Sequence, residues 1–168
     1  MSRLLYTPPS QLERVLGPTE DQLRYAILEQ PWEEWWNSPN NEAALEVVCA
    51  DGDNAHGGTT DIEKTGKRIE FAAGRPFLTI KQPSADDFFL RLYAAENEFV
   101  PYNGESFADY QIDHWGGEEL RIPTACLVDA PTALTIVHRF VSSIQRSDVV
   151  EWYKVEELPR DEDIYGDF

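Results

Sequence analysis

Hydrophobic residues recur at helical spacing in the first thirty residues. A pattern that starts after Ser10, a plausible N-cap, and runs to Leu16 predicts a short helical turn, which Gly17-Pro18 ends. Thr19 can cap a second helix, which Pro31 stops. Its expected apolar stripe consists of Leu23, Tyr25, Ala26, Ile27 and Leu28.

The clearest helical pattern lies in the last third of the chain. Asp129 can cap this helix, and Pro131 falls in its first turn, where its missing N–H costs no hydrogen bond. Its apolar positions recur at intervals of three and four: Ala133, Leu134, Val137, Phe140, Val141 and Ile144.

Strands are expected where short runs are rich in β-branched and aromatic residues or alternate with period two. Turn signals with Gly, Pro and Ser separate these runs, and such short turns favour antiparallel pairing. Gly116-Gly117 predicts a hairpin between two of them. The expected strands are residues 45–50, 67–71, 76–80, 88–93, 110–115, 119–122 and 149–155, with an exposed loop at 51–58.

These elements predict an α+β fold, with a mostly antiparallel sheet, N-terminal helices and one C-terminal helix packed on it. The chain has 168 residues and is 42% hydrophobic, which suits one packed core. We therefore expect a single globular domain over residues 1–168. Residues 157–168 form an acidic, aromatic C-terminal tail in this interpretation.

The charge changes this picture more than any motif. Asp and Glu number 31 against 14 Lys and Arg, so the formal net charge is -17. Such a field repels nucleic acid and anionic membranes and speeds encounter with basic proteins. Because the N-terminus lacks a secretory signal and no segment resembles a membrane span, we expect a cytoplasmic protein without nucleic-acid or membrane partners. Acidity for solubility alone is the alternative explanation of the charge.

Motifs for chemistry are weak. The three histidines show no metal-ligand spacing, and residues 51–62 lack the Gly and Glu that a calcium loop needs. Cys49 and Cys126 lie in apolar stretches, which favours two reduced thiols, although a bridge between them stays open. The chain contains no nucleophile elbow and no phosphate-binding glycine loop. We therefore predict no catalytic residue, no metal and no cofactor.

The last third of the chain carries a family resemblance. Its features are Trp115-Gly-Gly-Glu-Glu-Leu-Arg-Ile-Pro123, a helix after Asp129 that holds Ala133 and Phe140, and a closing segment centred on Trp152. This arrangement resembles the small immunity proteins of bacterial polymorphic toxin systems, most of all the family first described beside deaminase toxins. The resemblance implies a cytosolic α+β protein that binds and blocks a toxin's catalytic domain, with no catalytic residue of its own.

Candidate toxin-binding residues combine carboxylates with aromatic side chains. The first group is Trp32, Glu33, Glu34, Trp35 and Trp36, because one helix face cannot bury all three tryptophans and leave both glutamates solvated. The alternative is that two of these tryptophans belong to the core. Trp152 is expected in the core, because it lies within an apolar strand.

Two further groups of candidate toxin-binding residues lie elsewhere in the sequence. In the C-terminal tail, apolar side chains need burial that a partner could supply, and its candidates are Asp161, Glu162, Asp163 and Tyr165. Docking onto the chain's own sheet, or disorder, would explain the tail equally well. Asp86 and Asp87 precede an expected strand and add to an acidic face, for which an ordinary solvated surface is the alternative.

Three functions remain open from the sequence. The first is an immunity protein that neutralises one cognate toxin, and the second is an acidic mimic of nucleic acid that inhibits several unrelated DNA-binding enzymes. The mimic should show carboxylates in rows at phosphate-like spacing, whereas immunity should be selective. An enzyme of unrecognised class is the third and requires a pocket with perturbed titratable groups.

Overall fold

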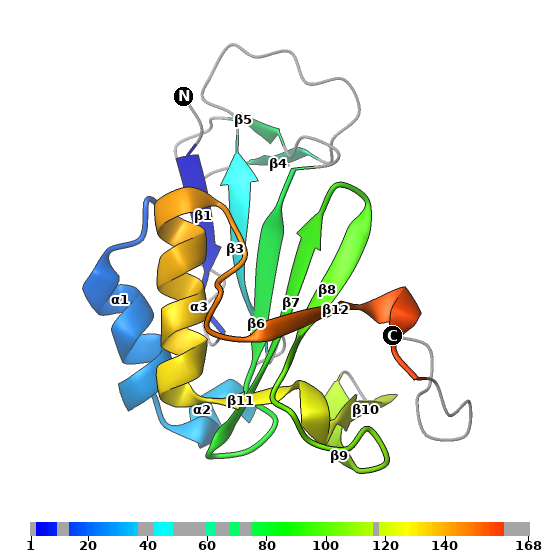
Figure 1. The fold of residues 1–168 in the computed structure, drawn as a ribbon. Helices are drawn as coiled ribbons and strands as arrows, with labels where there is room; N and C mark the ends of the chain where they lie inside the picture. The colour runs from blue at the N-terminus through cyan, green and yellow to red at the C-terminus, as the bar shows by residue number, and fades with distance from the viewer. Residues whose placement is uncertain are drawn as a thin grey trace.

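The computed structural model describes residues 3–9, 14–36, 42–48, 60–62, 68–70, 75–115 and 118–159. Its main feature is a large antiparallel sheet with helices on one face, as predicted for an α+β protein (Figure 1). The strand order is β12-β8-β7-β6-β3-β1-β2, and β11 pairs with β7 beside this path. The strands are β1 (Arg3–Thr7), β2 (Val15–Leu16), β3 (Glu42–Val48), β6 (Phe77–Lys81), β7 (Asp87–Ala94), β8 (Asn97–Tyr102), β11 (Leu127–Asp129) and β12 (Glu151–Lys154).

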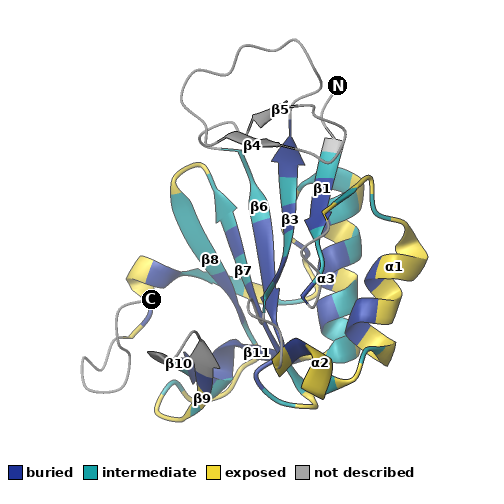
Figure 2. Cartoon of the chain, turned by 180° about the vertical axis from the view of Figure 1, so that it is seen from behind, coloured by how far each residue is buried: buried dark blue, intermediate teal, exposed yellow. Residues whose placement is uncertain are grey.

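Two small antiparallel sheets accompany the main sheet. One joins β4 (Thr60–Ile62) to β5 (Arg68–Glu70), and the other is the hairpin of β9 (Tyr110–Trp115) and β10 (Glu118–Pro123). The predicted hairpin is thus confirmed, but it forms a sheet of its own instead of extending the main one. It lies near the lower end of the main sheet, at the lower left in Figure 2.

The N-terminal helical layer begins where the sequence predicts. Thr19 and Gln22 form a capping box at the start of α1 (Glu20–Arg24), in which each side chain accepts a bond from the other's backbone N–H. The helix continues as the π-helical segment η1 (Tyr25–Glu29), and Gln30 N donates to the carbonyl of Tyr25 over 2.8 Å. A short helix, α2 (Trp32–Trp36), follows.

The last helix, α3 (Ala130–Ser143), is confirmed with its predicted cap. The Thr132 backbone N–H donates to Asp129 Oδ1 over 2.9 Å, and the helix ends at Ile144, a left-handed residue with φ of 56°. Short 3₁₀ turns, η2 (Thr124–Cys126) and η3 (Val155–Glu157), flank β11 and β12. In Figure 1, α1 and α3 lie side by side across one face of the sheet.

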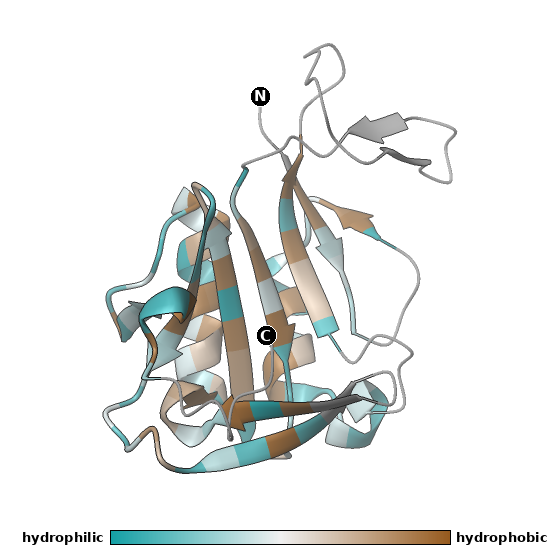
Figure 3. Cartoon of the chain, turned by 90° about the vertical axis from the view of Figure 1, so that its right-hand side faces the viewer, coloured by the Kyte–Doolittle hydropathy of each residue, from teal (hydrophilic) through white to brown (hydrophobic). Residues whose placement is uncertain are grey.

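Apolar side chains form a core on each face of the sheet, coloured dark blue in Figure 2 and brown along the strands in Figure 3. The larger cluster joins the helices to β1, β3, β6 and β7, and includes Trp35, Leu45, Leu78, Phe88 and Phe140. The second lies on the opposite face and includes Phe89, Val100, Ile122, Cys126 and Leu127. Burying one such aliphatic or aromatic side chain contributes about 1.5–3 kcal/mol, so these clusters fix the placement of the strands.

Several local predictions are wrong, and for the strands the reason is tertiary pairing. Val15 and Leu16 do not continue a helix; they form β2 and pair with Tyr6 and Leu5 of β1. The strands β1, β8 and β11 were not expected. The exposed fractions of Tyr25 (48%) and Leu28 (41%) show that the apolar stripe of the second helix is narrower than predicted.

Other predictions are confirmed or lie outside the described residues. The expected strands correspond to β3, β5, β6, β7, β9, β10 and β12, with ends shifted by a few residues. Cys126 is a free thiol, and burial raises its pKa to about 12. Cys49, the loop at 51–58 and the tail after residue 159 lie outside the described residues. No helix in the described ranges is long and apolar enough to cross a membrane.

Candidate functional site

Helix α2 places its three tryptophans in three different environments. Trp35 has no exposed surface and meets Phe88 edge-on, with ring centroids 5.9 Å apart and an interplanar angle of 83°. Trp35 is therefore a core residue, and its prediction as a toxin contact is corrected. Its indole belongs to the main cluster. Trp32 lies three positions earlier and therefore on the same face of the helix.

Trp32 and Trp36 form a ring pair at the boundary of the core. Their centroids lie 5.5 Å apart, and the planes are tilted by 37°. Trp32 is half-buried, and its Nε1 donates to the backbone carbonyl of Gln82 over 3.1 Å. Trp36 keeps 39% of its surface exposed, and Glu33 and Glu34 beside it are exposed as well. Helix α2 therefore presents a partly exposed indole and two exposed carboxylates.

The Trp32–Gln82 bond joins α2 to the turn between β6 and β7. In this turn Gln82 Nε2 donates to the carbonyl of Ala85 over 3.1 Å, and Ser84 Oγ donates to Asp87 Oδ2 over 2.7 Å. Asp86 is exposed and Asp87 is half-buried. The fold therefore brings together two candidate groups that are about fifty positions apart in sequence. We call the combined surface the acidic–aromatic edge: Trp32, Glu33, Glu34, Trp36, Asp86 and Asp87.

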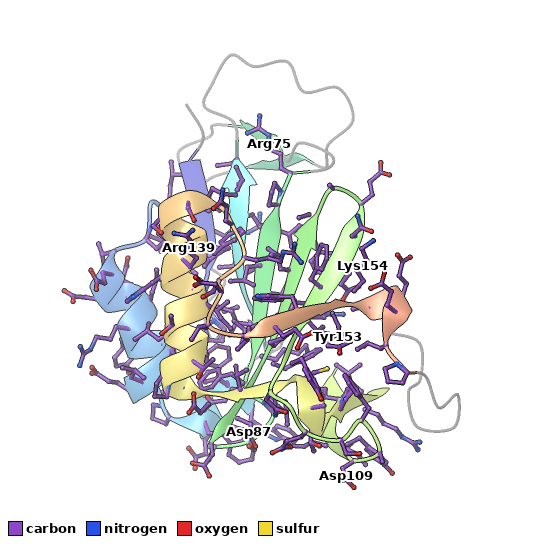
Figure 4. All side chains as sticks on the ribbon, in the orientation of Figure 1. Arg75, Asp87, Asp109, Arg139, Tyr153 and Lys154 are labelled. Atoms are coloured by element: carbon purple, nitrogen blue, oxygen red, sulfur yellow. The ribbon has the colours of Figure 1, made fainter. Side chains whose placement is uncertain are left out.

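A groove of about 700 Å³ adjoins this edge and shares Asp87 with it. Apolar side chains of Tyr102, Leu127, Val128, Val149 and Val150 line part of the groove. The remaining lining includes four carboxylates, those of Asp87, Glu105, Asp129 and Glu151. In Figure 4, half-buried Asp87 and exposed Asp109 both lie along the lower end of the molecule.

Two of the groove carboxylates face each other across strands. Asp129 of β11 is the direct antiparallel partner of Asp87 of β7, an arrangement that places like charges on one face and is unfavourable in itself. Each carboxylate accepts a hydrogen bond, Asp87 from Ser84 Oγ and Asp129 from the Thr132 backbone N–H. Hydrogen bonding to Thr132 lowers the pKa of Asp129 below its usual value, so this side chain stays ionised.

Asn103 fixes one wall of the groove. Its Nδ2 donates to the carbonyls of Thr124 and Leu127 over 2.8 and 3.0 Å, and its Oδ1 accepts from the Glu105 N–H over 2.8 Å. Gly104 between them has a φ of 93°, a conformation that favours glycine. The amide thus holds the turn that presents Glu105 against η2 and β11.

A buried ion pair joins β6 to the β9–β10 hairpin. Lys81 Nζ is 3.4 Å from Asp113 Oδ2, and the two side chains are only 3% and 1% exposed. Burial lowers the pKa of Lys81, while Asp113 and Glu42 act to raise it. Sequence reasoning missed this pair, because only the packing of β9 against β6 brings the two residues together.

The remaining predicted residues divide between the core and the undescribed tail. Trp152 is half-buried, packs against the main cluster and donates from Nε1 to the Ser147 carbonyl over 2.8 Å, in agreement with its predicted place. Asp161, Glu162, Asp163 and Tyr165 lie outside the described residues.

No protein-family model and no curated protein matches this chain. The function therefore has to be argued from the surface. Among the described residues, no group of three or more His, Cys, Asp or Glu side chains is placed to hold a metal ion. What the arrangement offers is a rigid surface that combines exposed indole, apolar lining and ionised carboxylates. Such a surface is suited to contact with a cationic protein.

Proposed function

We propose that this chain is a cytoplasmic immunity protein that binds and neutralises a cognate bacterial toxin acting on nucleic acid, such as a deaminase or nuclease. The observation that carries the proposal is the acidic–aromatic edge, where the Trp32–Gln82 bond unites α2 with the carboxylates of the β6–β7 turn. The C-terminal resemblance to immunity proteins supports the same function. It implies a binding protein without catalytic residues.

The edge has the chemistry that such a partner requires. Exposed Trp36 supplies apolar contact area with few rotatable bonds, and tryptophan is enriched among residues that dominate binding energy. Glu33, Glu34 and Asp86 add exposed negative charge to the same edge. A toxin that acts on nucleic acid needs a basic substrate channel, and an acidic inhibitor can occupy that channel.

The net charge of -17 gives the encounter its speed. Electrostatic steering raises association rates to roughly 10⁸ per molar per second or more at low salt, against about 10⁵ to 10⁶ for neutral surfaces. An immunity protein must bind before the toxin acts, so a fast encounter is useful. The buried Trp35 contributes indirectly, since it anchors the helix that presents Trp36 and the two glutamates.

Co-expression tests the proposal. The chain is produced with the protein encoded by the adjacent open reading frame, and the pair is purified by affinity pull-down at low and high salt. We expect a one-to-one complex, rescue of growth from the toxic neighbour, and weaker retention at high salt. A neighbour that is toxic, yet neither bound nor neutralised, contradicts the proposal.

The same material separates immunity from mimicry of nucleic acid. The purified chain is added to several unrelated nucleases and DNA-binding enzymes. An immunity protein leaves them active while it blocks its cognate toxin, because specificity depends on the shape of the edge as well as on charge. Equal inhibition of all of them would favour the mimic instead.

A further inference from the structure

The groove beside the acidic–aromatic edge has an amphipathic lining. Its accessible aliphatic surface comes from Val149, which is 48% exposed, and from half-buried Val150, while the buried side chains of Leu127 and Val128 complete the apolar lining. Carboxylates border this surface, and its lining residues, all of them described, include no Lys, Arg or His. A side chain with a long apolar stem and a cationic head would match both parts.

The charge in the groove has no described counter-ion. Asp87, Glu105 and Glu151 form no ion pair with the described basic side chains, and Asp129 is occupied with capping α3. The opposed positions of Asp87 and Asp129 add mutual repulsion. A bound cation would reduce this repulsion, and this reduction favours binding of the cation.

We propose that the groove is an arginine-binding subsite, which receives an arginine side chain projecting from the toxin surface. This inference rests on the proposed immunity function for the source of the arginine. The aliphatic stem packs on Val149 and Val150, and the guanidinium lies between Asp87 and Asp129. Arginine fits better than lysine, because its planar fork can donate to two neighbouring carboxylates at once.

The first test uses the isolated protein and a small probe. Agmatine, which carries a guanidinium on an aliphatic stem, is titrated into the ¹⁵N-labelled chain and followed by NMR. We expect saturable changes in the chemical shifts of the backbone amides of Asn103, Gly104 and Thr132, with a dissociation constant in the millimolar range. Amylamine, the ammonium counterpart of agmatine, should bind more weakly. Absence of saturable shifts, or equal affinity for the two probes, would overturn the assignment.

The paired variants Asp87→Asn and Asp129→Asn should abolish these shifts. Asparagine caps a helix about as well as aspartate and still accepts a bond from Ser84, so the fold is retained. A control with the same change of charge is Glu156→Gln with Glu157→Gln, two exposed positions in η3 outside the groove. Agmatine binding that survives in the groove variant, or is lost in the control, contradicts the inference.

The complex gives the second test. Toxin affinity should fall about 10- to 100-fold in the groove variant and less than threefold in the control, as expected when a desolvated charge pair loses one partner. Wild-type protein that binds agmatine but no toxin would refute the proposed function and leave the cation site standing. Toxin binding that is equally strong in the groove variant would refute the arginine subsite alone.

Discussion

Two neighbouring tryptophans in α2 have opposite surroundings. Trp35 is completely enclosed by the core, whereas Trp36, the next residue, keeps 39% of its surface exposed. The difference follows from helix geometry, because consecutive residues point about 100° apart around the axis. A substitution at one position therefore tests the stability of the fold, and the same substitution at the other tests binding.

We predict that Trp35→Ala lowers the free energy of unfolding by about 3–5 kcal/mol, because it leaves a large cavity beside Phe88. Trp36→Ala should change it by about 1 kcal/mol or less, since a half-exposed ring loses less burial. Urea unfolding followed by circular dichroism measures both. For toxin binding we expect the opposite order, in which Trp36→Ala lowers the affinity more than Trp35→Ala does among variants that fold. A folded Trp36→Ala protein with full toxin affinity would show that this ring lies outside the interface.

Asp129 connects the groove to helix stability. Asp129→Ala should cost about 1 kcal/mol through loss of the cap, and Asp129→Asn should cost much less. Because hydrogen bonding to Thr132 lowers the folded-state pKa of Asp129, the ionised cap contributes fully above the pKa of this group in the unfolded chain and is lost as the pH falls through the folded-state pKa. The difference in unfolding free energy between wild type and Asp129→Ala should shrink in acid. A difference that grows instead would contradict this account.

At the scale of elements, the β9–β10 hairpin is attached to the main sheet by two different kinds of contact, one apolar and one ionic. Ile122 of β10 is fully buried in the second cluster, and Asp113 of β9 is paired with Lys81 in the interior. Buried ion pairs add little net stability, because desolvation offsets their attraction, but removing one partner leaves a costly buried charge. The pair therefore fixes where the hairpin sits more than it strengthens the fold.

We predict that Lys81→Met lowers the free energy of unfolding by about 3–5 kcal/mol, because it removes the buried positive charge that pairs with the Asp113 carboxylate. The double variant Lys81→Met with Asp113→Leu should recover most of this loss, since two apolar side chains replace the pair. Lys154→Met is the matched control, because Lys154 is more exposed and its contacts with Glu156 and Glu157 are long, at 3.8 and 3.9 Å. Chemical unfolding of the wild type, Lys81→Met, Asp113→Leu and the double variant gives the coupling energy, and additive losses would show that the two residues act independently.

Elements with strong local signals could be predicted from the sequence. Asp129, Pro131 and the apolar period define α3, and Thr19 defines the start of α1. The start of β8 was missed because its turn uses Ala95 and Glu96 at positive φ, where the usual signal is glycine or asparagine. Val15 and Leu16 fit a helix locally, but pairing with β1 makes them a strand.

The candidate site follows the same division. Exposure of Glu33, Glu34 and Asp86 could be expected from their charge. Which tryptophan is buried could not, because that depends on how α2 packs against Phe88. The opposed pair of Asp87 and Asp129 depends on the register between β7 and β11, which join segments about forty residues apart. Long-range register leaves no local signal in the sequence.

For the whole molecule, net charge should control the rate of complex formation. We predict that association with the toxin slows steeply as salt rises, while dissociation changes little. Glu33→Gln with Glu34→Gln should slow association more than Glu156→Gln with Glu157→Gln, because the first pair lies on the acidic–aromatic edge. Stopped-flow measurements over a salt series test this. Equal effects of the two pairs would mean that total charge acts without regard to its position.

The ends of the main sheet have a consequence for behaviour at high concentration. In the described sheet the outermost strands are β2, with two residues, and β12, with four. Long exposed edge strands recruit strands from other molecules and start aggregation, whereas short ones offer few backbone groups to pair with. Molecules that also repel one another through a charge of -17 should resist fibre formation even when they are highly concentrated.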